Sequence, residues 1–115
     1  LGMKKVMPLR RGDVYWVNLD PTVGTEINKK RPAVIVSNDT GNEYSNRVIV
    51  APITSKASRI FPFEVLVTVK DKTGKALLDQ IRSIDKVRLD SKIDHLDSVT
   101  MLEIDIALKK VLALK

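Results

Sequence analysis

Cysteine is absent from the 115 residues of this chain, which excludes disulfide bonds and metal sites built on thiolates. The same absence favours a reducing compartment such as the cytosol. No apolar run approaches the roughly 18 residues of a membrane-spanning helix, and no charged-then-apolar stretch resembles a signal peptide. Aromatic residues make up 4% of the chain, and we expect most of them in the core.

Clustered acidic residues are missing as well. The 14 aspartates and glutamates are dispersed, whereas a site for Mg²⁺ needs several carboxylates close together. Asp94 and Asp97 have helical spacing and are interpreted as acids at the start of a helix. The single histidine, His95, is interpreted as a packed or surface residue, and it excludes chemistry that needs two histidines of one chain. We therefore predict no metal site and no cofactor.

Basic residues outnumber acidic ones by 20 to 14, which gives the chain a net charge of +6. Such an excess favours polyanionic partners, either nucleic acid or an acidic protein segment. A lysine-rich surface that is merely well solvated would have the same composition. Charge alone therefore leaves both interpretations open.

The length of the chain fits one compact domain, and a hydrophobic fraction of 43% is sufficient for its core. We expect this single domain to cover residues 3–115. Leu1 and Gly2 precede Met3 and are interpreted as a cloning remnant ahead of the natural start.

Short segments rich in β-branched residues, separated by turn residues, predict an antiparallel sheet. Pro32 is expected to fix the start of the second strand. The expected strands cover residues 13–19, 33–37, 47–53, 63–69 and 76–84, with turns at 38–42 and 71–74. This pattern is typical of a small antiparallel barrel or sandwich.

From Asp97 onward the apolar residues recur at helical spacing, and Asp97 or Ser98 is expected to cap the helix. We expect the helix to close the barrel or to lie across it. The fold class is therefore mostly β with one long C-terminal helix. The recurring apolar residues form two sets, Val99, Leu102 and Ile106, and Ile104, Leu108, Val111 and Leu112.

Residues 24–39 join a polar, basic loop to a buried strand, and the loop carries a carboxylate, an amide, two lysines and Arg31. Such a loop suits a phosphate-rich ligand. Together with other blocks in matching order, this segment resembles the MazF/PemK family of toxin endoribonucleases. The resemblance implies the SH3-like antiparallel barrel of these toxins. The blocks span about residues 11–89 and comprise 11–16, 19–22, 24–39, 50–54, 61–65 and 76–84.

The resemblance implies that Arg31 and Thr54 are catalytic. A guanidinium group is permanently charged and donates in a planar fork, which suits a phosphate that gains negative charge. Thr54 stands at the exit of a strand, where its hydroxyl can steady a non-bridging phosphate oxygen. Without the resemblance, Arg31 fits an exposed arginine before a strand and Thr54 fits an ordinary hydroxyl turn.

The resemblance also places Thr25, Glu26 and Gln80 at RNA-contacting positions, where a carboxylate and an amide can read unpaired bases. Residues 27–30 are bulkier and more basic than the glutamine and glycines of many relatives, so the RNA sequence that those relatives cut is not carried over. The remaining residues expected to contact RNA are Asn28, Lys29, Lys30, Ser55 and Lys56.

The implied reaction needs no metal ion, because RNA supplies its own nucleophile. The ribose 2′-hydroxyl attacks the adjacent phosphate and leaves a 2′,3′-cyclic phosphate and a 5′-hydroxyl. The protein supplies orientation, charge stabilisation and proton transfer. The proton acceptor is not identified by the sequence, since an arginine is a poor base.

Two other functions remain open at this stage. A non-catalytic SH3-like nucleic-acid-binding module would explain charge and fold, but not the conjunction of Arg31 with Thr54. A gyrase poison of the related barrel toxins acts through a tail with tryptophan, which residues 112–115 lack. The partners implied by the resemblance are single-stranded RNA, a cognate antitoxin with an acidic disordered tail, and a second copy in a cytoplasmic homodimer without membrane association.

Overall fold

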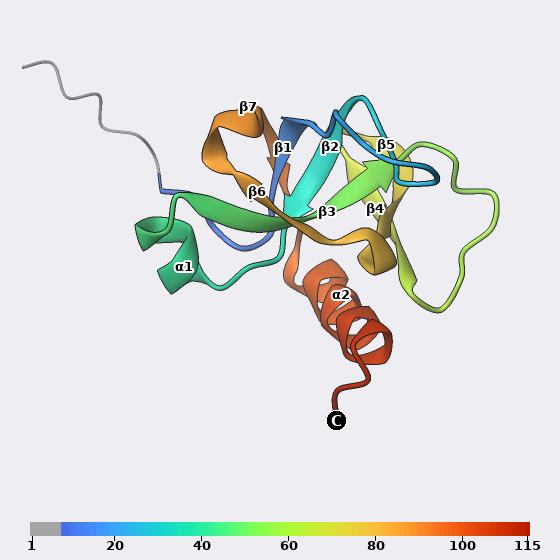
Figure 1. Cartoon of the computed structure of the whole chain (residues 1–115). Helices are drawn as coiled ribbons and strands as arrows, with labels where there is room; N and C mark the ends of the chain where they lie inside the picture. The colour runs from blue at the N-terminus through green and yellow to red at the C-terminus, as the bar shows by residue number, and fades with distance from the viewer. Residues whose placement is uncertain (1–7) are drawn as a thin grey trace, which may run out of the picture.

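The structure is a computed structural model that describes residues 8–115, so the interpretation of residues 1–3 lies outside the described residues. Strands dominate, and a helix of 14 residues follows them at the C-terminal end (Figure 1). The expected fold class, mostly β with a C-terminal helix, is confirmed. The elements in chain order are β1 (Asp13–Asn18), β2 (Lys30–Ile35), α1 (Asp39–Tyr44), β3 (Arg47–Thr54), β4 (Glu64–Val69), β5 (Lys72–Leu77), η1 (Leu78–Gln80), β6 (Arg82–Asp85), η2 (Lys86–Arg88), β7 (Leu89–His95) and α2 (Ser98–Val111).

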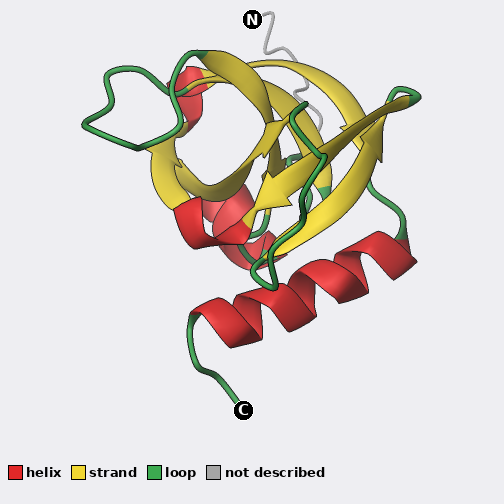
Figure 2. Ribbon diagram, turned by 90° about the vertical axis from the view of Figure 1, so that its right-hand side faces the viewer, coloured by secondary structure: helices red, strands yellow, loops and turns green. Residues whose placement is uncertain are grey.

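All strand pairs in the described residues are antiparallel, in the order β4-β5-β3-β2-β1-β7, and β6 pairs with β3 beside this path. The sheet curls strongly on itself, and α2 lies across its outside (Figure 2). The helix packs against β4 and η1, so it lies across the barrel as expected.

The apolar run at 33–36 is buried because its side chains alternate between two cores. Val34 packs with Ala51 of β3 and with Ile104 of α2, on the side of the sheet that the helix covers. Ala33 and Ile35 point the other way, into a second core that contains β6. A strand that is covered on both faces has a continuous apolar sequence.

Helix α2 begins where the sequence predicts. The Asp97 carboxylate accepts a hydrogen bond of 2.8 Å from the Thr100 amide, and this bond lowers the pKa of Asp97. Ile104, Leu108 and Val111 pack on the sheet, whereas Leu112 of the same set and all of the other set remain exposed. No helix in the described part is long and apolar enough to cross a membrane.

The predicted turn at 38–42 is wrong, because Asn38 caps the short helix α1 by accepting from the Gly41 amide at 2.8 Å. The predicted strand 33–37 is also misplaced, since β2 begins at Lys30 and ends at Ile35. Pro32 lies inside β2, opposite Trp16, where β2 pairs only with β1. A residue without an N–H fits there, since the pairing with β3 begins at Ala33.

The predicted strand 76–84 is broken at η1 because its two halves pair with different parts of β3. Ala76 lies opposite Ile53, and Arg82 lies opposite Val50. More residues lie between Ala76 and Arg82 than between their partners Ile53 and Val50 on β3. The extra residues form the 3₁₀ turn η1. Strand β7 was not predicted, because this exposed edge strand carries few apolar residues. The assignment of Asp94, which lies in β7, to a helix start is wrong.

Candidate active site

Arg31 and Thr54 line one pocket of about 390 Å³, here called the Arg31–Thr54 pocket. Arg31 comes from the start of β2 and Thr54 from the end of β3, so two strands of the curled sheet bring them to one hollow. The other lining residues are Trp16, Lys30, Pro32, Ile53, Ser55, Val69, Lys70, Lys72, Thr73, Gly74 and Ile93.

The guanidinium of Arg31 is oriented by its own loop. Its Nε donates to the Asn28 carbonyl at 2.7 Å, and its backbone lies opposite Val17 of β1. This contact uses one donor and leaves the two terminal nitrogens for a ligand. A guanidinium held in this way presents a preformed fork to a phosphate.

The hydroxyl of Thr54 is fixed from the side of the following loop. Thr54 is buried, and its Oγ1 accepts a hydrogen bond of 3.3 Å from the Lys56 amide. This is the local hydroxyl turn that the sequence allows. It occupies an acceptor site of the oxygen, so the hydroxyl proton remains available for donation to a ligand.

Gly74 of β5 lies against the Thr54 backbone. A Cβ atom at residue 74 would stand 2.7 Å from the Thr54 carbonyl oxygen, a contact that requires backbone movement. Replacing Gly74 with alanine is therefore expected to destabilise the protein by about 1–3 kcal/mol and to displace Thr54. Thermal unfolding measures the first effect, and the RNA cleavage that the resemblance implies measures the second. Gly41→Ala, where the nearest contact is an ordinary 3.4 Å, is the control. Wild-type stability in Gly74→Ala would contradict this packing.

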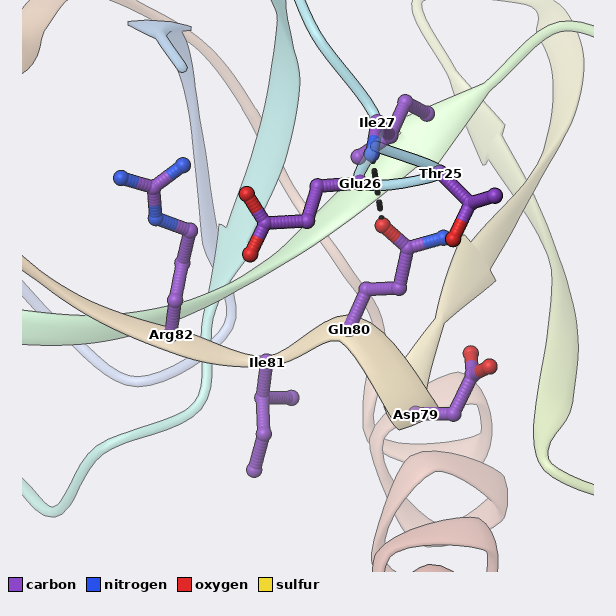
Figure 3. A pocket seen from close by; sticks show the side chains of 7 residues that line it. All are labelled: Thr25, Glu26, Ile27, Asp79, Gln80, Ile81 and Arg82. Carbon is purple, nitrogen blue, oxygen red and sulfur yellow. Dashed lines mark hydrogen bonds between the residues drawn. The ribbon is translucent and has the colours of Figure 1, made fainter. Parts of the chain in front are cut away.

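A second pocket, of about 410 Å³, adjoins the loop before Arg31 and is called the Glu26–Gln80 pocket (Figure 3). Gln80 Oε1 accepts a hydrogen bond of 2.7 Å from the Ile27 amide, and Glu26 Oε1 accepts one of 2.7 Å from the Val23 amide. The side-chain NH₂ of Gln80 and the second oxygen of Glu26 remain for a ligand. Its lining residues are Thr25, Glu26, Ile27, Asp79, Gln80, Ile81 and Arg82.

The family described as PemK-like, MazF-like toxin of type II toxin–antitoxin system matches residues 10–112. The chain belongs to this family.

Solved structures of endoribonuclease toxins have the same fold. MazF from Deinococcus radiodurans is 26% identical, with 95% of this chain and 100% of that chain covered and a TM-score of 0.84. An endoribonuclease from a mycobacterial species is 27% identical, with 96% and 97% covered and a TM-score of 0.79. A mycobacterial endoribonuclease solved with its cognate antitoxin is 28% identical, with 93% and 97% covered and a TM-score of 0.79. The resemblance and the barrel fold predicted from the sequence are thereby confirmed.

The toxin's remaining predicted site residues divide between the pockets and their rims. Lys30 and Ser55 line the Arg31–Thr54 pocket, and Lys30 also forms an ion pair with Asp90. Three exposed residues that are also expected to contact RNA line neither pocket, namely Asn28, Lys29 and Lys56. Asn28 and Lys56 act instead through their backbones, on Arg31 and Thr54 respectively.

Lys75 of β5 supports the loop that follows Thr54, a role that no sequence pattern predicted. Its partly buried ammonium donates to Glu64 and to the Arg59 carbonyl, both at 2.8 Å. Burial raises the pKa of Glu64, but hydrogen bonds from Lys75 and from the Phe61 amide outweigh it and hold the pKa below its usual value. Glu64 therefore remains charged and paired with Lys75 next to the β3–β5 register.

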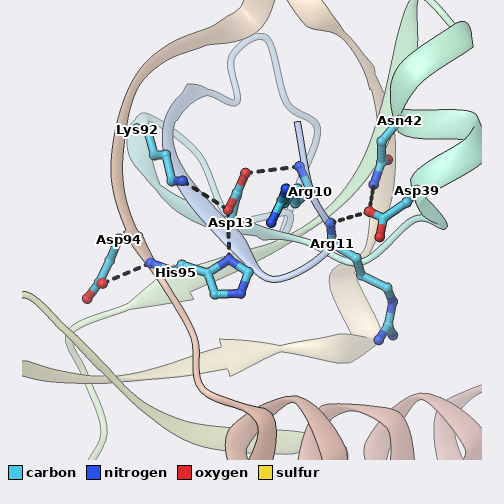
Figure 4. Close-up of polar contacts among 8 residues, drawn as sticks. All are labelled: Arg10, Arg11, Asp13, Asp39, Asn42, Lys92, Asp94 and His95. Carbon is cyan, nitrogen blue, oxygen red and sulfur yellow. Dashed lines mark hydrogen bonds and ion pairs between the residues drawn. The ribbon is translucent and has the colours of Figure 1, made fainter. Parts of the chain in front are cut away.

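His95 lies in another part of the toxin, between β7 and the start of β1 (Figure 4). Its Nδ1 is 2.7 Å from Oδ1 of the buried Asp13, which also lies 3.3 Å from the Lys92 ammonium. His95 lines neither pocket, in keeping with its interpretation as a packed or surface residue. Among the described residues, no three His, Asp or Glu side chains are grouped to hold a metal ion.

Proposed function

We propose that this toxin endoribonuclease cuts single-stranded messenger RNA in the Arg31–Thr54 pocket and thereby inhibits translation and growth. The 2′-hydroxyl of one nucleotide attacks the neighbouring phosphate, leaving a 2′,3′-cyclic phosphate and a 5′-hydroxyl. The observation that carries the proposal is the convergence of a loop-oriented Arg31 and a buried Thr54 hydroxyl on one hollow. No metal ion is needed, because the charge is stabilised by fixed donors.

Arg31 and Thr54 divide the work at the phosphate. The terminal nitrogens of Arg31 neutralise the charge that develops on the non-bridging oxygens, and the Thr54 hydroxyl donates to one of them. The pocket favours this charge, since none of its lining residues, all within the described part, is acidic. The binding of a phosphate there is also favoured by Lys30, Lys70 and Lys72.

The Glu26–Gln80 pocket has the opposite chemistry and suits a base rather than a phosphate. Two carboxylates, Glu26 and Asp79, line it together with one cation, Arg82, whose Nη1 donates to the Leu19 carbonyl at 2.9 Å. Carboxylates repel phosphates and accept hydrogen bonds from amino and imino groups on the edge of an unpaired base. The free NH₂ of Gln80 can donate to a carbonyl or ring nitrogen of the same base. This pocket is our proposal for the source of sequence selectivity.

Control of the activity is assigned to a second protein. A structural relative was solved with its cognate antitoxin, and we propose that an antitoxin with an acidic disordered tail occupies the basic pocket of this toxin in the cytoplasm. A tail that folds into the pocket would compete with RNA for Arg31.

We also propose that the toxin acts as a homodimer, since an isologous interface would cover apolar residues such as Val99 and Leu102 of α2, which the protomer exposes.

Purified toxin is expected to cut single-stranded RNA in the presence of excess EDTA. DNA of the same sequence should bind but remain uncut, because it lacks the 2′-hydroxyl. The measurement is gel analysis of end-labelled RNA and DNA, with mass spectrometry of the new ends. Loss of cutting in EDTA with recovery in Mg²⁺ would contradict the mechanism, and binding without cutting under every condition would favour the non-catalytic module.

A further inference from the structure

We propose that Trp16 and the β4–β5 hairpin form a second nucleotide subsite in the Arg31–Thr54 pocket, in which Trp16 stacks on a base and Lys70 and Lys72 bind a backbone phosphate. The subsite would hold the nucleotide next to the cut, on the side away from the Glu26–Gln80 pocket. This inference rests on the proposed function, because the ligand is the same single-stranded RNA.

Trp16 is placed to stack on a ligand rather than to fill the core. Its side chain lines the pocket and is 39% exposed, whereas its neighbours Val14 and Val17 are fully buried. In the β1–β2 register Trp16 lies opposite Pro32, directly beside the Val17–Arg31 pair. A base that stacks on this indole therefore lies one residue along the sheet from the proposed catalytic cation. Stacking of bases on aromatic rings is tolerant of sequence, which suits a position next to the cut.

The hairpin that carries the two lysines is held in a fixed conformation. Val69 pairs with Lys72, so the turn contains only Lys70 and Asp71, whose φ angles of 47° and 67° match a primed two-residue turn. The Lys70 amide donates to Asp94 Oδ2 of β7 at 3.0 Å, and this bond lowers the pKa of Asp94. The backbone of the turn is thereby anchored, and the exposed ammonium groups are free to contact a phosphate.

The charges around the pocket support a phosphate at the hairpin. Four cationic side chains line it, and of these Lys30 is already paired with Asp90. Arg31 is assigned to the cut phosphate, so Lys70 and Lys72 remain for the next one along the strand. The two carboxylates of the Glu26–Gln80 pocket disfavour a phosphate on that side. The RNA backbone is therefore expected to run from Arg31 towards the hairpin.

Trp16 is the only tryptophan of the chain, so emission excited at wavelengths that its two tyrosines do not absorb comes from this subsite. A 2′-O-methyl oligonucleotide of mixed sequence, which cannot be cut, is titrated into the full chain. We expect saturable quenching of the Trp16 emission. Fluorescence that stays unchanged while anisotropy of a labelled oligonucleotide shows binding would overturn the stacking assignment.

Variants then separate the two parts of the subsite. Trp16→Ala should weaken binding of the labelled oligonucleotide roughly tenfold, and Trp16→Phe, which keeps an aromatic face, should restore most of it. The pair Lys70→Gln and Lys72→Gln should weaken binding and reduce the slope of log K against log salt by about 1 to 2. The control pair Lys109→Gln and Lys115→Gln removes the same charge outside the pocket. It should change the slope and the affinity less than the pair at Lys70 and Lys72 does. Equal effects of the two lysine pairs would overturn the phosphate assignment.

The outcome is separable from that of the proposed function. Quenching and the lysine effect in a toxin that never cuts RNA would leave the subsite standing and remove the reaction. Normal cutting together with wild-type binding by Trp16→Ala and by the hairpin variant would remove the subsite and leave the reaction. Thermal unfolding of each variant accompanies the titrations, and the lysine pair tests the proposal even where Trp16→Ala does not fold.

Discussion

Replacement of Arg31 by alanine is expected to lower kcat/KM for RNA cleavage by at least about 10²-fold. A fixed donor aimed at developing charge contributes roughly 2.7–4 kcal/mol to the transition state, and Arg31 adds a full positive charge to its donors. Its guanidinium makes one loop contact, to the Asn28 carbonyl, so the melting temperature should change little. Single-turnover cleavage of an end-labelled RNA measures the rate, and calorimetry measures the stability.

Two matched variants make this result specific. Arg31→Lys keeps the charge but loses the planar fork, and it should recover only part of the rate. Arg47→Ala removes the same charge from the exposed far end of β3 and should cut RNA at nearly the wild-type rate. Comparable losses in Arg47→Ala and Arg31→Ala would mean that net charge, rather than the site, governs cleavage.

Replacement of Thr54 by valine is expected to slow cleavage about 10- to 10²-fold, less than the loss at Arg31. Valine keeps the buried shape and removes only the hydroxyl, and one neutral donor stabilises a phosphate less than a cation does. The Lys56 amide, which donates to Thr54 Oγ1 at 3.3 Å, would turn to water because Lys56 is exposed. Thr54→Ser should retain most of the rate. The rates are measured as for Arg31.

The same substitution at Thr68, exposed on β4, controls for a general effect on the sheet. In the combined Arg31→Ala and Thr54→Val variant the losses should be less than additive, because both groups act on one phosphate. Strict additivity would mean that the two residues act independently, and a wild-type rate in Thr54→Val would remove Thr54 from the site.

Much of the fold follows from local patterns in the sequence. The sequence predicts β1, β3 and the start of α2 at Asp97 nearly to the residue. Turn residues mark the ends of the two strands, and a capping carboxylate marks the start of the helix. The errors occur where long-range pairing overrides local preference. The break at η1 exists because β3 pairs with β5 and β6 in turn, and β7 is an exposed edge without strong alternation.

The candidate site was predictable only in part for a related reason. Arg31 and Thr54 were proposed from the resemblance, and the structure places both at one pocket, while their catalytic roles stay predictions. Lys70 and Lys72 were missed as pocket residues, and Trp16 was not assigned to the site because most aromatics were expected in the core; all three meet Arg31 only after the sheet has curled (Figure 2). Asp79 and Arg82 of the Glu26–Gln80 pocket were missed for the same reason, although they lie close to Gln80 in the sequence, and Gln80 was expected to contact RNA.

The proposed reaction depends on a single oxygen atom of the substrate, the 2′-hydroxyl beside the cut phosphate. An RNA with one mapped cleavage site is compared, in EDTA, with the same RNA carrying a 2′-deoxy nucleotide on the 5′ side of the cut phosphate. We expect this one substitution to abolish cutting there, a 2′-deoxy nucleotide on the 3′ side to leave the cut intact, and the unmodified RNA to yield a 2′,3′-cyclic phosphate. Continued cutting at the deoxy position, or ends with a 3′-hydroxyl and a 5′-phosphate, would contradict it.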